Sequence, residues 1–190
     1  LEQQFLLNGV RIYFLEIKLG TNFKELKVTV DLDQEVLRSK PDYIVYKPGS
    51  VDGSTHDTGN EHFLVFDGPD ESLMAIWTQS TYEGACDHRI IFSRSDDEGE
   101  TWAPPKLLVG PPRVGTGFMS SWGFPLVSHS GRIYVIYNQY HGIDDVKHQF
   151  TGTMDCIYSD DIGVTWSTPQ TIPMKKSPLD HPDPNVYSNW

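Results

Sequence analysis

The sequence predicts an all-β protein built from four-stranded antiparallel sheets, and three observations lead to this expectation. One short motif occurs twice in the 190 residues. The same pattern of apolar strands precedes both occurrences. Apolar residues show little helical periodicity anywhere in the chain, so strands are the elements that can supply the core.

The repeated motif reads S-x-D-x-G-x-T-W, at residues 95–102 and again at 159–166. Each occurrence follows a short apolar strand and leads into a segment that contains proline. In a tight hairpin turn the Asp carboxylate can accept backbone N–H bonds, while Gly supplies a positive φ. The Trp is expected to fold back as an apolar plug. A structural role, not a catalytic one, is therefore expected for four acidic residues: Asp96, Asp97, Asp160 and Asp161.

A second repeat lies upstream of each motif and has the pattern of a β-hairpin. Apolar residues 63–66 and 73–77 flank a turn in the first hairpin, and residues 125–128 and 133–138 do so in the second. Each unit therefore reads strand, turn, strand, long loop, strand, motif, strand. That order is the four-stranded antiparallel blade from which a β-propeller is built.

The paired motifs resemble the Asp boxes of the BNR-repeat sialidase superfamily, whose members are six- or seven-bladed β-propellers. The resemblance covers roughly residues 60–175. It implies one blade at 51–112, a second at 113–176, and a loop at 177–190 that leads to a further blade. Since propellers have about 4–8 blades, the two to three blades of this chain imply that the remainder of the propeller is covalently attached or is a partner chain.

The first fifty residues are predicted to form an N-terminal β segment (1–50) that either closes a ring or makes an edge sheet. Strand-like patterns occur at 10–18 and at 26–33. The chain begins with Leu and shows no signal-like segment, so we expect a mature product of a secreted or periplasmic protein.

Composition narrows the function classes. The chain has 15 Lys and Arg against 26 Asp and Glu, a formal net charge of −11 and a pI near 4.9. An acidic chain without a basic cluster is a poor candidate for binding nucleic acid or an anionic membrane. No apolar run is long enough to span a bilayer. Two cysteines, Cys86 and Cys156, are too few for a disulfide scaffold, and whether they pair stays open.

Blade topology sorts the loops into two faces. The first hairpin turn and the repeated motif fall on the bottom face. The loops that enter the first strand and that join the second to the third strand fall on the top face. The expected top-face loops are 54–62, 79–89, 113–124, 139–153 and 178–190, and most of the seven histidines lie in them. Histidine is the side chain best suited to proton transfer near neutral pH.

Position in these loops selects the candidate catalytic residues. His62 begins an innermost strand, so its side chain is expected near the central channel. His88 ends the second top loop, where the nearby carboxylates of Glu83 and Asp87 can orient it or raise its basicity. The candidate substrate-binding residues are Glu61, Arg89, Trp122, Tyr140 and His141.

The sequence departs from the sialidase pattern at one informative position. Sialidases open their first blade with Arg-Ile-Pro, whose Arg grips the sialic acid carboxylate, and here Glu61-His62-Phe63 occupies that place. A carboxylate would repel the substrate anion. The resemblance makes Glu83 or Asp87 the nearest counterpart of the sialidase acid/base Asp, and it assigns the sialidase nucleophile, a Tyr paired with a Glu, to later blades.

Three functions follow from these features. The resemblance favours an exo-acting glycoside hydrolase that removes a terminal acidic sugar, with Glu83 or Asp87 as general acid/base and Trp122 or Tyr140 stacking on the sugar. The histidines and the loss of the Arg-Ile-Pro motif favour a polysaccharide lyase, with His62 or His88 as the base and Arg89 holding a uronate carboxylate. The third hypothesis is a propeller that binds a glycan without catalysing a reaction. No cofactor or metal site is predicted, and no motif supports a structural Ca²⁺ in the channel.

Overall fold

The structure is a computed structural model. It describes residues 40–113, 115–142, 152–175 and 178–179 with their side chains, and the backbone of residues 4–7, 10–13, 151 and 187–188. The chain divides into two compact units, residues 1–43 and residues 44–190.

In the first unit, β1 (Gln4–Leu7) and β2 (Val10–Tyr13) pair as an antiparallel hairpin. β2 covers the beginning of the strand predicted at 10–18. The strand predicted at 26–33 lies outside the described residues.

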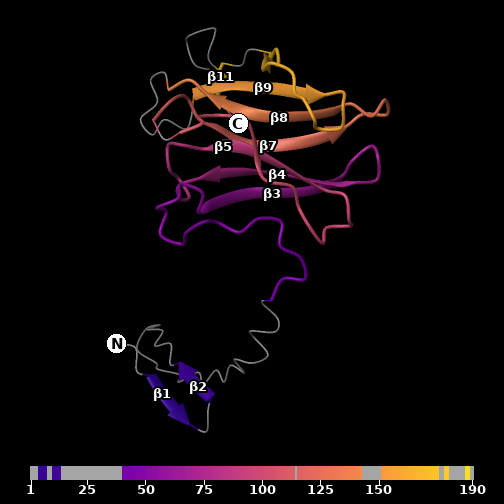
Figure 1. Cartoon of the computed structure of the whole chain (residues 1–190). Helices are drawn as coiled ribbons and strands as arrows, with labels where there is room; N and C mark the ends of the chain where they lie inside the picture. Colours follow the sequence, from indigo (N-terminus) through magenta and orange to yellow (C-terminus); the bar gives the residue numbers. More distant parts are fainter. Residues whose placement is uncertain are drawn as a thin grey trace. The chain divides into compact units, whose positions relative to one another are not determined.

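The second unit contains two antiparallel sheets (Figure 1). The first has the order β3-β4-β5-β6. Its strands are β3 (Gly59–Asp67), β4 (Leu73–Ser80), β5 (Arg89–Ser95) and β6 (Lys106–Val109). The second has the order β10-β9-β8-β7, with β11 also paired to β9. Its strands are β7 (Ser120–Val127), β8 (Ile133–Tyr140), β9 (Thr151–Ser159), β10 (Gln170–Thr171) and β11 (Tyr187–Ser188).

The two sheets pack face to face, with β7 lying against β3, β4 and β5 (Figure 1). A first core cluster fills the space between them. Met74, Ile76 and Ile90 of the first sheet belong to it, and so do Ile133 and Val135 of the second; all five are fully buried. Burial of this apolar surface is the main force that holds the two sheets together.

A second, smaller core cluster lies on the opposite face of the first sheet. Ala75, Trp77 and Ile91 form it, and Tyr46 and Trp102 are among the residues that cover it. β4 is therefore buried on both faces, which explains its continuous apolar run. The predicted all-β fold of four-stranded antiparallel blades is confirmed. Among the described residues, no helix is long and apolar enough to cross a membrane.

The two Asp boxes fold in the same way. In the first box, Asp97 Oδ1 accepts the Thr101 backbone N–H at 2.8 Å, and Asp97 Oδ2 accepts the Thr101 hydroxyl at 2.5 Å. The Gly99 N–H donates to Ser95 Oγ at 2.8 Å, and Trp102 Nε1 donates to the Gly99 carbonyl at 3.1 Å. Gly99 has a φ of +92°, which confirms why glycine occupies this position.

The second box reproduces the first bond for bond. Asp161 accepts the Thr165 N–H at 2.8 Å and the Thr165 hydroxyl at 2.5 Å. Gly163 donates to Ser159 Oγ at 2.8 Å, and Trp166 Nε1 donates to the Gly163 carbonyl at 3.2 Å. These hydrogen bonds lower the pKa of Asp161 to about 2.

The other aspartate of each box forms an ion pair. Arg94 contacts Asp96 at 2.6 Å, and Arg132 contacts Asp160 at 2.6 Å. The four aspartates of the boxes are thus used in folding, and the expectation that they are structural is confirmed.

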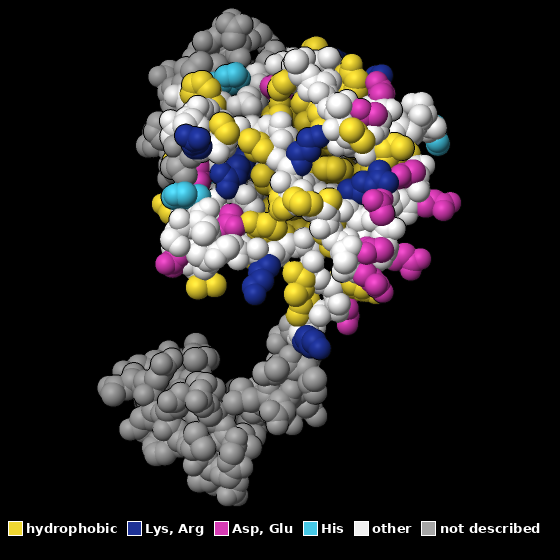
Figure 2. Space-filling view, viewed as in Figure 1, with side chains coloured by type: hydrophobic (Ala, Val, Ile, Leu, Met, Phe, Trp, Pro, Cys, Tyr) yellow, Lys and Arg dark blue, Asp and Glu magenta, His cyan; other side chains and the backbone are white. Residues whose placement is uncertain are grey.

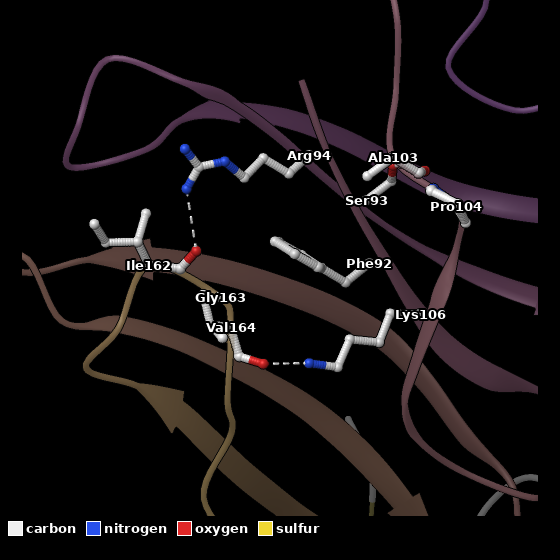
Figure 3. A pocket seen from close by; sticks show the side chains of 9 residues that line it. All are labelled: Phe92, Ser93, Arg94, Ala103, Pro104, Lys106, Ile162, Gly163 and Val164. Atoms are coloured by element: carbon white, nitrogen blue, oxygen red, sulfur yellow. Dashed lines mark hydrogen bonds between the residues drawn. The ribbon is translucent and has the colours of Figure 1, made fainter. Parts of the chain in front are cut away.

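Two cationic side chains of the first blade reach the second Asp box. Around a cavity of about 260 Å³, Arg94 Nη1 donates to the Ile162 carbonyl at 3.4 Å and Lys106 Nζ donates to the Val164 carbonyl at 2.5 Å (Figure 3). This cavity lies at the end of the blades that carries the Asp boxes, where the first blade packs against the second.

Candidate functional site

The innermost strands β3 and β7 carry the same irregularity at equivalent positions. The β3–β4 register shifts between Glu61 and Leu64, and the β7–β8 register shifts between Ser121 and Phe124. Immediately after Glu61, His62 has a φ of +50°, and immediately after Ser121, Trp122 has a φ of +56°. Residues with a side chain seldom adopt this left-handed conformation, and such strain clusters at functional sites. Bulges of this kind re-aim side chains.

The two bulged residues meet each other. The His62 ring lies 5.7 Å from the Trp122 ring at an interplanar angle of 86°, an edge-to-face contact. Trp122 also lies 6.5 Å from the ring of Tyr140, which is 3% exposed. The Trp122 backbone N–H donates to Thr78 Oγ1 of the neighbouring blade at 2.9 Å, which fixes the bulge. The structure thus brings three of the candidate residues together.

His88 is built into the same place. The residue is 8% exposed, and Nδ1 of its imidazole lies 2.7 Å from Ser121 Oγ. The Ser120 N–H donates to the His88 carbonyl at 3.0 Å, which ties the start of β5 to the start of β7. Burial lowers the pKa of His88, while the nearby carboxylates of Glu61 and Asp87 oppose this effect. At neutral pH the ring is therefore predominantly neutral.

Two buried polar atoms at this place have no hydrogen-bond partner among the described residues. They are Nε2 of His88 and Oε1 of Glu61. Glu61 is also close enough to act on His88 electrostatically. Burying polar atoms without partners is costly, and native structures avoid it except where a ligand, a water or a reaction uses them. We call Glu61, His62, His88, Ser121 and Trp122 the bulge site.

The structure gives Asp87 and Glu83 other surroundings. Asp87 is 1% exposed, and its two oxygens accept the Thr81 N–H at 3.1 and 3.2 Å and the Thr81 hydroxyl at 2.6 Å. Its carboxylate therefore closes the loop between β4 and β5. Glu83 is exposed on the tip of that loop, where the Ala85 N–H donates to the Tyr82 carbonyl at 3.0 Å.

Arg89 lies on the other face of the first sheet. Successive side chains on a strand point to opposite faces, and Ile91 of β5 belongs to the second core cluster while Ile90 belongs to the first. Arg89 therefore shares the face of Ile91 and lines a groove of about 570 Å³ with it. The lyase hypothesis needs Arg89 on the same side of the sheet as His88. The structure places the Arg89 side chain on the opposite face.

His141 lies at the end of β8, where its Nε2 is 3.1 Å from Thr153 Oγ1 and its ring is 6.2 Å from the Phe118 ring. The rest of that loop, residues 143–150, lies outside the described residues. The described residues contain no group of three or more His, Cys, Asp or Glu side chains placed to hold a metal ion.

Two residues of this region are not among the candidates that the sequence predicts. They are Ser121, which contacts His88, and Thr81, whose hydroxyl and N–H donate to Asp87. An alignment of the two bulges would have found Ser121, because it stands at the position of Glu61. No local sequence signal marks Thr81.

Comparison with known proteins agrees with this fold. The model of the BNR repeat-like domain family matches residues 71–186. No curated protein matches the sequence. The solved structure of Hadza microbial sialidase Hz136 is similar with a TM-score of 0.52 and 21% identity, covering 63% of this chain and 27% of that one. A protein of unknown function from Dyadobacter fermentans DSM 18053 is similar with a TM-score of 0.50 and 16% identity, covering 69% of this chain and 39% of that one.

At these identities the two structures show the fold alone, and this chain spans well under half the length of each. The family model covers more than half of the chain. The chain therefore belongs to the BNR repeat-like domain family, within the Asp-box sialidase superfamily of β-propellers.

Proposed function

We propose that this chain is part of a carbohydrate-active enzyme, a glycoside hydrolase that acts on a sugar held at the bulge site. The observation that carries this proposal is the pair of buried, unpartnered atoms Glu61 Oε1 and His88 Nε2 beside two strained, ring-bearing residues, His62 and Trp122. A sugar hydroxyl can both donate and accept a hydrogen bond, so it is a suitable partner for these two atoms.

In this proposal Glu61 takes the place of Glu83 and Asp87 as the acid/base carboxyl group. Glycoside hydrolysis needs a carboxylic acid that gives a proton to the leaving oxygen. Asp87 is occupied by Thr81, and Glu83 lies on an exposed turn, whereas Glu61 has an oxygen that is buried and free of partners within the described structure. The imidazole of His88, oriented by Ser121, is proposed to assist this carboxyl group through the sugar or a bridging water, because Glu61 is close enough to act on His88 electrostatically.

Trp122 is proposed to bind the apolar face of the sugar ring, with the buried ring of Tyr140 packed beside it as support. Both are aromatic, and the Trp122 backbone is held by Thr78, so its ring is already positioned before a ligand arrives. Further blades, covalent or from a partner chain, are proposed to complete the ring and to supply the second catalytic group.

The second candidate is a polysaccharide lyase, which the neutral state of His88 favours. A neutral imidazole can remove the proton next to a uronate carboxylate. The cation that must stabilise the resulting charge is not Arg89, because Arg89 lies on the other face of the sheet. Another blade would have to provide it.

The test is a product assay on the full-length polypeptide with a panel of acidic glycans. Reducing sugar without new ultraviolet absorbance is the expected result, and it should be lost in Glu61→Gln and retained in Asp87→Asn. Absorbance of an unsaturated uronate that disappears in His88→Gln would establish the lyase instead. Glycan binding without either product would leave a non-catalytic binding propeller.

A further inference from the structure

Phe118 is an exposed aromatic residue close to the bulge site. It lies in the loop between β6 and β7, two residues before β7 begins, and it is 60% exposed. Its ring lies 6.2 Å from the ring of His141 at an interplanar angle of 51°. Single apolar side chains are common on protein surfaces, so exposure alone does not indicate a site. The way in which both rings are held gives the further evidence.

The backbone next to Phe118 is fastened to the end of β8. The carbonyl of Met119 accepts the Tyr140 N–H at 3.0 Å and Gln139 Nε2 at 3.1 Å. Met119 itself is 4% exposed, so the residue that follows Phe118 is anchored in the interior. The Phe118 ring is thus presented to solvent from a fixed backbone, and a ligand that binds to it has little loop entropy to remove.

A chain of hydrogen bonds fixes the tautomer of His141. Its Nε2 lies 3.1 Å from Thr153 Oγ1, and the Thr153 hydroxyl donates to Asp155 Oδ1 at 2.7 Å. A hydroxyl has one proton to donate, and Thr153 gives it to the carboxylate, so Thr153 Oγ1 accepts its other bond from Nε2–H of His141. In the neutral imidazole Nδ1 is then an acceptor. It makes no hydrogen bond within the described residues.

The support beneath His141 is buried. Thr153 is 4% exposed and Asp155 is 7% exposed. Second-layer hydrogen bonds of this kind hold a histidine ring in one orientation. The structure therefore places an apolar ring and an oriented hydrogen-bond acceptor next to each other.

Charge is distributed unevenly over the second unit. Asp and Glu side chains gather at the end of the sheets that carries the first hairpin turns and the Asp boxes, on the right of Figure 2. Phe118 and His141 lie at the opposite end, where β7 begins and β8 ends. Residues 110–119, which lead to β7, contain one charged side chain, Arg113. These surroundings suit a ligand that carries hydroxyl groups and no charge.

We propose that Phe118 and His141 form a second sugar subsite, which binds a neutral hexose next to the sugar held at the bulge site. The face of the Phe118 ring packs against the C–H groups of the hexose, and Nδ1 of His141 accepts a hydrogen bond from one of its hydroxyls. An aromatic surface with one oriented polar group is the usual composition of a small-ligand site. A carboxylate is disfavoured here, because the neutral His141 ring offers it a lone pair and no proton.

The second subsite adjoins the first. Tyr140 ends β8 and His141 follows it, so consecutive residues carry the Trp122–Tyr140 contact and the Phe118–His141 contact. Consecutive Cα atoms are about 3.8 Å apart, which brings both contacts within reach of neighbouring units of one glycan. The inference rests on the proposed function for its ligand class, and it makes the ligand a chain of at least two sugars.

The test is saturation-transfer NMR on the full-length polypeptide at about pH 8, where a histidine side chain is ordinarily neutral. The probes are lactose, which is neutral, and digalacturonate, which is acidic. We expect the C–H protons of lactose to receive saturation, and Phe118→Ala to weaken lactose binding by about tenfold. Tyr43→Ala is the matched control: Tyr43 is 59% exposed and belongs to the first unit, so its loss should leave lactose binding unchanged.

Two variants of His141 test the hydrogen bond. His141→Gln keeps a donor near the position of Nε2 and removes the acceptor Nδ1, whereas His141→Asn keeps an acceptor near the position of Nδ1. We expect His141→Gln to weaken lactose binding by up to about tenfold, the range for one hydrogen bond, and His141→Asn to weaken it less. Full lactose binding by His141→Gln would contradict the role of Nδ1.

Absence of lactose binding, or no effect of Phe118→Ala on it, would overturn the inference. If digalacturonate lost as much affinity as lactose in Phe118→Ala, the neutral class of the sugar would be wrong. Glu61→Gln separates this inference from the proposed function, because it should abolish turnover and leave lactose bound at Phe118. Lactose binding that depends on Phe118 in a polypeptide without turnover would support the subsite and refute the hydrolase. Turnover without lactose binding would refute the subsite alone.

Discussion

His62 and Trp122 stand at the same position of two neighbouring blades, and their rings meet edge to face at 5.7 Å. Both residues have a positive φ, +50° and +56°, in a bulge that follows the same register shift. The fold thus uses one backbone device twice to turn a side chain out of an innermost strand. Glycine would suit the backbone of each bulge better, so the presence of His62 and Trp122 there indicates that their side chains are needed.

Replacing His62 by glycine should stabilise the backbone and remove function. His62→Gly is expected to raise the free energy of unfolding by about 1 kcal/mol relative to His62→Ala, because only glycine adopts the left-handed region without cost. Urea denaturation measures this difference. Glu71, exposed with a φ of +69°, provides the control: Glu71→Gly should gain similarly over Glu71→Ala while glycan binding stays unchanged. Equal stability of His62→Gly and His62→Ala would contradict the strained bulge.

The Asp boxes should account for part of the acid sensitivity. The folded pKa of Asp161 is about 2, below its ordinary value of 3.8, so its stabilising effect is present above 3.8 and is lost as pH falls toward about 2. The melting temperature of the parent chain should therefore fall more steeply over this range than that of Asp161→Asn. The variant should also melt lower at neutral pH. Glu100→Gln, which removes an exposed charge from the other box, is the control, and its melting temperature should follow that of the parent at every pH. If the melting temperature of Asp161→Asn fell with pH as steeply as that of the parent, the stabilising role of the hydrogen-bonded turn would be contradicted.

His88 should make the fold less stable in mild acid. Burial lowers its folded pKa below the ordinary value of 6.5, so the unfolded chain binds a proton that the folded chain does not. Stability is then complete above about pH 6.5 and decreases as pH falls toward the folded pKa. Thermal melts across this window should show a smaller loss in His88→Gln than in the parent. His129→Gln, at an exposed turn, should behave as the parent does, and identical slopes for all three proteins would mean that His88 titrates normally.

Gly110 should tolerate no side chain. Gly110→Ala combines a left-handed φ with a contact of 2.7 Å to Arg89 Cα, and we expect it to destabilise the chain by about 2–4 kcal/mol. Gly84→Ala is the matched control, since Gly84 has a φ of +77° and nothing within 4 Å of its Cβ position. It should lose only about 1 kcal/mol, the cost of the left-handed conformation. Comparable losses in chemical denaturation would show that the close approach is not tight.

The two cysteines should behave as separate thiols. Cys86 is free and exposed, while Cys156 is free and half-buried, with its pKa raised by burial. A thiol reagent such as dithionitrobenzoate should therefore modify Cys86 quickly and Cys156 slowly in the folded chain, and both together after unfolding. A mass two protons lower, with no reactive thiol, would instead indicate a disulfide.

The sequence was most informative where a backbone requirement dictates residue types. The Asp boxes were predicted in full, because a turn that needs a carboxylate acceptor and a positive-φ glycine accepts few alternatives, and Asp97 and Asp161 make identical bonds. The two hairpin patterns in the sequence likewise predicted the strands of both blades. The fold class follows from these local features, since each unit is one run of adjacent antiparallel strands.

The candidate site was less predictable, because its geometry depends on bulges and strand faces that the sequence does not mark. Alternation places Arg89 away from His88, although the two are neighbours in the chain. Asp87 looked like a partner for His88 and instead closes its own loop on Thr81. The contact between His62 and Trp122 joins two blades, and only the packing of the sheets reveals it.

The most direct test of the proposed acid/base pair is the turnover rate of the full-length polypeptide with a glycan substrate in two matched variants, Glu61→Gln and Glu83→Gln. The substitutions make the same chemical change at a buried, unpartnered carboxylate oxygen and at an exposed one. We expect kcat to fall by about 10²- to 10⁴-fold in Glu61→Gln, the usual contribution of a general acid or base, with little change in Glu83→Gln. A full rate in Glu61→Gln, or the larger loss in Glu83→Gln, would contradict a catalytic centre at the paired bulges.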